Sequence, residues 1–97
     1  LIPLRNRLKT MTEIYEKIVT KVTETKDSEY IDFHARRMVE MAGHIIMGHL
    51  LLLDTTRCDS FRTSAEVYIH YGESEVTKNA KFIDQFDVED LEFYRMK

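Results

Sequence analysis

Residues that interrupt helices are scarce in this sequence. Among its 97 residues are three glycines and a single proline, Pro3, so no proline breaks a helix anywhere beyond the third residue. Cysteine is equally rare, because Cys58 stands alone; this excludes an internal disulfide and favours a reducing, cytoplasmic compartment. These absences favour an all-α fold over a turn-rich or disulfide-stabilised one.

Long apolar runs and an excess of positive charge are also absent. The longest apolar region, residues 38–53, is interrupted by Glu40, His44 and His49, whereas a bilayer span needs about 20 mostly apolar residues. There is no signal-peptide pattern. The net charge is −3 and no basic stripe dominates, so nucleic acid is not expected as a partner. A membrane partner is not expected either.

Apolar residues recur at helical spacing along three segments, which predict helices over residues 3–25, 29–56 and 60–86. Polar residues at 25–28 and 54–60 predict the two connections, and a short turn is expected from Asp87 onwards, with Val88, Leu91, Phe93 and Tyr94 as its apolar residues. We therefore predict one domain over residues 1–97, an antiparallel up-down-up bundle of three long helices with a short C-terminal turn. The inner faces of the first and third helices are predicted to carry Leu4, Leu8, Met11, Tyr15, Ile18 and Val22, and Phe61, Ala65, Tyr68, Ile69, Gly72, Val76, Ala80, Ile83 and Phe86.

The middle helix carries more apolar surface than a small bundle can cover. Over residues 45–53 it is apolar on almost every side, interrupted only by Gly48 and His49. Such a helix must be surrounded by protein, and two neighbouring helices cover two of its sides. Its inner face is predicted to carry Tyr30, His34, Met38, Met41, Ile45, His49 and Leu52. The residues predicted to contact further protein are Ile46, Met47, Leu50, Leu51 and Leu53.

Two Glu-x-x-x-His pairs, Glu40/His44 and Glu66/His70, raise the hypothesis of a metal site. Di-metal helical bundles use Glu-x-x-His instead, with the ligands facing inward. Glu40 falls about 140° from Ile45 around the helix, at roughly 100° per residue, and so faces away from the core. Surface Glu–His contacts therefore explain the pairs better, and a small metal-binding bundle stays an alternative hypothesis.

No residue is assigned to catalysis or to cofactor or metal binding. His34 and His49 are expected to be buried, neutral and hydrogen-bonded, because a catalytic histidine needs a nucleophile in a concave site. Cys58 follows Arg57, a cation that could lower the pKa of the thiol, but a small residue at a helix end is the simpler interpretation. Gly43 and Gly48 are interpreted as positions where a neighbouring helix crosses at close distance. Gly-rich phosphate loops and nucleophile elbows are absent.

Residues 36–86 read RRMVEMAGHIIMGHLLLLDTTRCDSFRTSAEVYIHYGESEVTKNAKFIDQF. This run resembles the helical C-terminal extension of the larger acyl-CoA dehydrogenases, both bacterial and of the very-long-chain mitochondrial type. In that extension a helix rich in small and aliphatic residues is followed by a polar break and a long helix with Tyr and Ala. Residues 44–53, 54–60 and 65–86 have this order, and residues 4–25 fit the segment that leads in.

The resemblance implies a non-catalytic C-terminal piece of a longer chain. The parent would be an FAD-dependent oxidoreductase of fatty acid metabolism that removes two hydrogens from the α and β carbons of an acyl thioester. Its flavin, acyl-CoA pocket and catalytic glutamate would all lie upstream of Leu1, which leaves no cofactor in this chain. The opening on Leu1, just before an amphipathic pattern, also suggests a piece of a longer polypeptide.

The implied partners are the catalytic core of the parent and a second subunit, in a homo-oligomer. Membrane docking is not expected, because no strongly basic amphipathic helix is present. Charged substitutions at the predicted contact residues, such as Leu51→Glu, are expected to preserve helicity and weaken self-association in sedimentation. The alternative is a free-standing all-α interaction or adaptor module, which the length of the natural open reading frame would distinguish.

Overall fold

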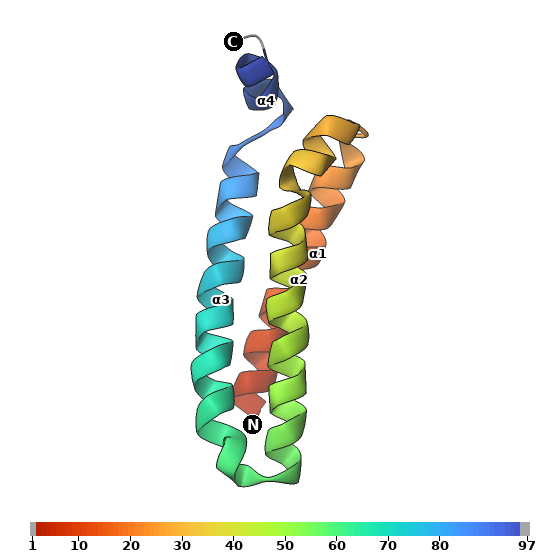
Figure 1. Ribbon diagram of the computed structural model, residues 1–97. Helices are drawn as coiled ribbons and strands as arrows, with labels where there is room; N and C mark the ends of the chain where they lie inside the picture. Colours follow the sequence, from red (N-terminus) through yellow and green to blue (C-terminus); the bar gives the residue numbers. More distant parts are fainter. Residues whose placement is uncertain (1, 96–97) are drawn as a thin grey trace.

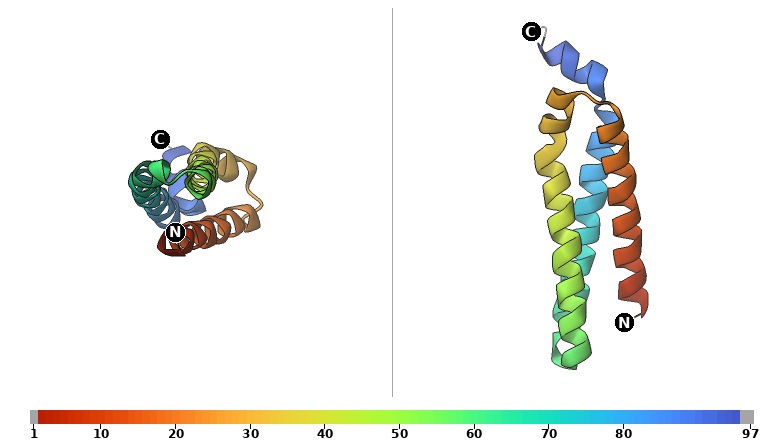
Figure 2. Two further views of the ribbon diagram at one scale, coloured as in Figure 1. Left: turned by 90° about the horizontal axis from the view of Figure 1, so that it is seen from below. Right: turned by 90° about the vertical axis from the view of Figure 1, so that its right-hand side faces the viewer.

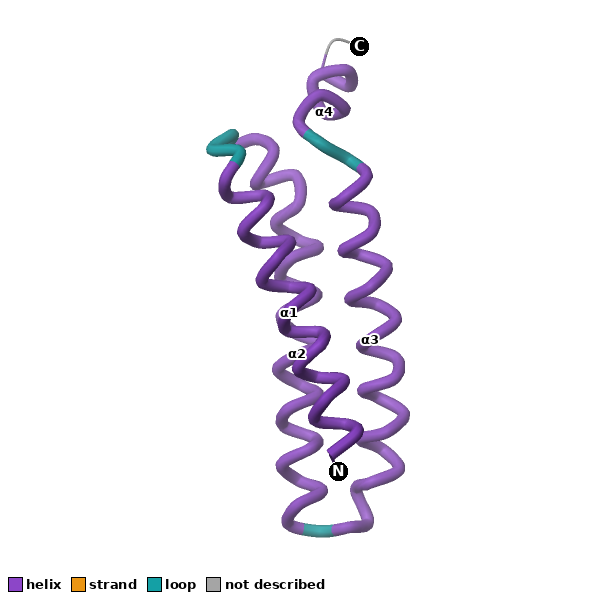
Figure 3. Tube along the Cα trace, turned by 180° about the vertical axis from the view of Figure 1, so that it is seen from behind, coloured by secondary structure: helices purple, strands orange, loops and turns teal. Residues whose placement is uncertain are grey.

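Three long helices lie side by side in the computed structural model, which describes residues 2–95 and their side chains as far as Phe93. α1 (Ile2–Glu24), α2 (Ser28–Arg57) and α3 (Arg62–Gln85) run up, down and up, and α4 (Val88–Arg95) follows as a short helix beyond the end of α3 (Figures 1 and 3). The described residues form an elongated body of 54 × 22 × 16 Å. The predicted all-α bundle is confirmed.

The connection between α1 and α2 lies where the polar residues predicted it. Lys26 adopts a left-handed conformation, with a φ of 53°, which ends α1 in the way that residues just past a helix often do. Asp27 caps α2: its Oδ1 accepts hydrogen bonds from the backbone N–H groups of Glu29 and Tyr30 at 3.1 and 3.2 Å.

The second connection is shorter than predicted, because α2 continues through polar residues to Arg57. Thr55 and Thr56 donate their hydroxyl hydrogen bonds back to the carbonyls of Leu51 and Leu53, so neither side chain competes with the helix. Only Cys58 and the 3-10 turn η1 (Asp59–Phe61) separate α2 from α3. The prediction of a break from residue 54 was therefore wrong.

The core runs along the line where the three helices meet, seen end-on in Figure 2. At its centre Gly48 brings α2 close to its neighbours, since a Cβ there would lie 2.6 Å from Leu8 Cδ2 and 3.5 Å from Ile69 Cγ1. Because Gly48 occupies the inward position, His49 is turned outward and exposed; its predicted burial was wrong. The buried apolar residues are Leu4, Leu8, Met11, Ile18, Val22, Tyr30, Met38, Met41, Ile45, Ala65, Ile69, Val76, Ala80, Ile83 and Leu91.

Two further residues in or next to α3 differ from the predicted inner face. Asn79 is buried although the pattern did not point to it, and Phe61, predicted to face inward, is exposed because it belongs to the 3-10 turn rather than to the helix. α4 is anchored by Leu91, which is buried, and by Val88, which packs against the core. The side chain of Tyr94 lies outside the described residues.

Candidate functional site

The residues predicted to contact further protein lie on the surface of α2. Ile46, Met47, Leu50 and Leu53 have side chains between 44% and 60% exposed. Leu51 differs, because it is half-buried and packs against the core. A charge at Leu51 would thus disturb folding as well as contacts with a partner, whereas a charge at the exposed Leu50 would affect those contacts alone.

An apolar line follows the side of α2 that faces away from the other helices. We call the residues Val39, Gly43, Ile46, Leu50 and Leu53 the outer stripe; all five are exposed. Gly43 is not a crossing point, because a Cβ there would have no atom within 4 Å, so its predicted role in close helix packing was wrong. Exposed apolar lines of this length are uncommon on monomers. The outer stripe is therefore the main candidate for a functional surface.

A second apolar surface is the groove between α2 and α3. Tyr68 bridges its walls, since its Oη lies 3.2 Å from Nδ1 of His44 on α2. Val67 and Tyr71 are 66% and 52% exposed, so the groove presents apolar and aromatic surface to solvent. The residues that line this α2/α3 groove are Leu51, Thr63, Ser64, Val67, Tyr68 and Tyr71.

His34 is buried among aromatic rings where α3 ends. Its Nε2–H donates to the carbonyl of Phe86 at 3.1 Å, and the hydroxyl of Tyr30 donates to the same oxygen at 2.7 Å. Nδ1 of His34 is buried without a hydrogen-bond partner, so a proton there would add an unpaired charge. Burial is the main reason why the pKa of His34 lies below its usual value; the nearby Arg37 guanidinium acts in the same direction. The prediction of a buried, hydrogen-bonded histidine is confirmed.

This histidine makes folding sensitive to acid. The unfolded chain takes up the proton at a higher pH than the folded chain, so stability is expected to fall as the pH drops below about 6.5. Urea midpoints measured between about pH 8 and about pH 5 should show this slope, and His34→Phe should flatten it. The exposed His70, replaced by Gln, is the control and should leave the slope unchanged. An equal slope in His34→Phe would contradict the assignment.

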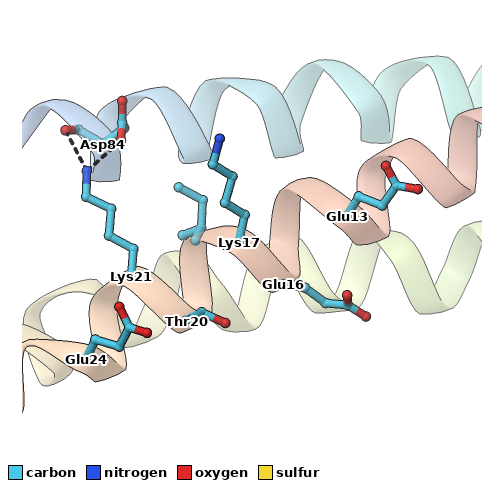
Figure 4. Close-up of a pocket in the computed structure, with 8 residues that line it drawn as sticks. Glu13, Glu16, Lys17, Thr20, Lys21, Glu24 and Asp84 are labelled. Atoms are coloured by element: carbon cyan, nitrogen blue, oxygen red, sulfur yellow. Dashed lines mark hydrogen bonds and ion pairs between the residues drawn. The ribbon is translucent and has the colours of Figure 1, made fainter.

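A charged groove lies between α1 and α3 (Figure 4). Lys21 reaches from α1 to Asp84 on α3, with 2.5 Å between Nζ and Oδ1, and this ion pair lowers the pKa of the Asp84 carboxyl. Both side chains are well exposed, so the pair contributes little to stability. The titratable residues that line this groove are all exposed, which suits a solvated surface rather than a reaction site.

The two Glu-x-x-x-His pairs are not brought together. Glu40 pairs with Arg36 at 3.4 Å, and His44 turns to Tyr68. Within residues 2–95 no group of three acidic, histidine or cysteine side chains is placed to hold a metal ion.

Cys58 is exposed between α2 and α3, with its Sγ 3.0 Å from the hydroxyl of Ser60. Hydrogen bonding to Ser60 is the main cause of the lowered pKa of the thiol, where the sequence had pointed to Arg57.

In the part of the chain that the structure describes, no helix combines the length and apolar character that a bilayer span requires.

Comparison with known proteins agrees with this architecture. The family described as "Acyl-CoA dehydrogenase C terminal" matches residues 1–91. A crystal structure of an acyl-CoA dehydrogenase family protein from Porphyromonas gingivalis is 46% identical, with a TM-score of 0.85 over 90% of this chain and 75% of that one. No curated protein gives a significant match. The match over nearly the whole length, together with the shared three-helix fold, shows that this chain belongs to the acyl-CoA dehydrogenase C-terminal family.

Proposed function

We propose that this chain is the non-catalytic C-terminal helical domain of an FAD-dependent acyl-CoA dehydrogenase, and that it packs on the catalytic core of the parent and supports oligomer assembly. The parent would oxidise acyl-CoA thioesters to 2-enoyl-CoA. Membership of the family supports the parent's identity. The observation that carries the packing role is the exposure of Ile46, Met47, Leu50 and Leu53 on a helix whose opposite side already fills the core.

The described residues do not fit a flavin site. The grooves between α1 and α3 and between α2 and α3 are lined largely by exposed side chains. The one buried side-chain polar atom without a partner among these residues, Nδ1 of His34, is enclosed by the rings of Tyr30, Phe33 and Phe86. The family resemblance implies that FAD would be bound by the catalytic core of the parent.

Burial of the outer stripe against protein would remove apolar area from water at about 25 cal/mol per Å². A carboxylate in such a contact would be desolvated without a partner, which costs far more than the lost apolar area alone. On a free helix surface the same carboxylate remains hydrated. A charge on the outer stripe is therefore expected to weaken binding of a protein partner while leaving the stability of the free domain almost unchanged.

Replacing Leu50 by Glu tests the proposal. The free energy of unfolding is expected to change by no more than about 0.5 kcal/mol, because the site is exposed. Self-association in sedimentation velocity, or capture of the separately expressed catalytic core, is expected to fall at least roughly tenfold, as for other truncated contact residues. His49→Glu is the matched control, since it places the same charge one residue away and off the stripe. Unchanged assembly and unchanged core capture in Leu50→Glu would overturn the proposal.

A further inference from the structure

The outer stripe belongs to a longer regular series on the same side of α2. Successive members are separated by four and three residues in alternation, which is the 3.5-residue period of a seam between two packed helices. Every member is exposed. The series places charges at its two ends and apolar residues between them. Its members are Asp32, Arg36, Val39, Gly43, Ile46, Leu50, Leu53 and Arg57.

We propose that a second copy of this chain occupies this seam, with its α2 antiparallel to the first. The inference rests on the proposed function, which requires a protein partner on the outer stripe; it assigns the stripe to a second copy rather than to the catalytic core, and it gives the direction of that copy. The arrangement is twofold, so each contact occurs twice. Figure 2 shows, seen end-on, that α1 and α3 both lie to one side of α2, and the exposure of every seam residue places the seam on the other side.

The charges decide the direction of the second helix. In a parallel pair, Asp32 would face Asp32 of the second copy, and Arg57 would face Arg57, so like charges would flank the seam at both ends. In an antiparallel pair Asp32 of each copy faces Arg57 of the other. Within the described residues, neither Asp32 nor Arg57 has an ion-pair partner in its own chain. Both are therefore available to pair across the seam.

The sizes of the apolar residues favour the same direction. The register that pairs Asp32 with Arg57 also sets Val39 opposite Leu50, and Gly43 opposite Ile46, of the second copy. Gly43 has open space around its missing Cβ, so a large Ile46 side chain can fill the position that glycine leaves empty. A parallel pair would instead place Gly43 against Gly43 and leave a void. Charge and size thus both favour the antiparallel direction.

Cysteine cross-linking in the purified chain tests this register, in a Cys58→Ser background. A mixture of Val39→Cys and Leu50→Cys chains is expected to form a disulfide-linked dimer under mild oxidation, because facing seam positions approach within the roughly 7 Å that a disulfide spans. Val39→Cys alone is the matched control. In the antiparallel register its two copies lie about 16 Å apart, at roughly 1.5 Å per residue, and are expected to remain unlinked.

A charge swap provides a second test. Asp32→Arg and Arg57→Asp, each alone, are expected to raise the dissociation constant of the dimer roughly tenfold, because each creates two like-charge pairs in a twofold dimer. The double variant Asp32→Arg/Arg57→Asp restores both pairs and should return to wild-type affinity.

Linkage of Val39→Cys to itself would overturn the antiparallel direction. If nothing is linked and the double variant rescues nothing, while Leu50→Glu still lowers core capture, the self-docking inference fails but the packing role stands. If Leu50→Glu also has no effect, both fail.

Discussion

Replacement of Leu8 by Ala is expected to lower the free energy of unfolding by about 3 kcal/mol, a large part of the roughly 5–15 kcal/mol typical of a small domain. Leu8 is fully buried, and it packs from α1 against α2 at the point where Gly48 has no side chain. Truncation leaves a cavity at the meeting point of the three helices, which the rigid helices cannot close. Urea denaturation followed by far-ultraviolet circular dichroism measures the change.

The same contact predicts a rescue. In the wild-type background, a Cβ on Gly48 would collide with Leu8 Cδ2 at 2.6 Å, so Gly48→Ala loses much of the roughly 1 kcal/mol that alanine gains over glycine in a helix. In the Leu8→Ala background the new methyl group enters the cavity, and Gly48→Ala should recover stability. Gly43→Ala is the matched control, because its Cβ would meet no atom of its own chain within 4 Å and its effect should be equal in both backgrounds. Equal effects of Gly48→Ala in the two backgrounds would refute the contact.

Replacement of Tyr30 by Ala is expected to cost about 4 kcal/mol, and replacement by Phe about 1 kcal/mol. Tyr30 is 1% exposed, and its hydroxyl donates to the carbonyl of Phe86, where α3 ends. Alanine removes the ring and the hydrogen bond, whereas phenylalanine keeps the ring and leaves His34 as the donor to that carbonyl. Denaturation measures the two costs.

Hydrogen exchange locates the effect of Tyr30→Phe. Because the lost bond holds the link between α3 and α4, faster exchange is expected first in α4 (Val88–Arg95) and in the last turn of α3. Tyr15→Phe is the control: Tyr15 is half-buried and none of the described hydrogen bonds uses its hydroxyl, so a change within about 0.5 kcal/mol is expected. Equal costs for Tyr30→Phe and Tyr15→Phe would contradict the role of the Phe86 carbonyl.

Periodicity alone located much of the candidate site. The excess of apolar residues over 45–53 identified α2 as the helix with more apolar surface than the bundle can bury. Four of the five residues predicted from it to contact further protein are exposed. It missed Val39 and Gly43 as members of the outer stripe, because single apolar or small residues between charged ones do not stand out in a local window. Once the exposed positions are known, the alternation of four and three residues connects them.

The sequence by itself determined the number of long helices, the connection at residues 25–28 and most of the buried line of α1, because these follow from local propensity and from the spacing of apolar residues. Only the tertiary structure decided that Gly48 rather than His49 faces the core, and that Tyr30 and His34 share the Phe86 carbonyl. The physical reason is that these outcomes depend on atoms from other helices. Leu8 and Ile69 need the space beside Gly48, and the Phe86 carbonyl comes within reach of α2 only after the helices have packed.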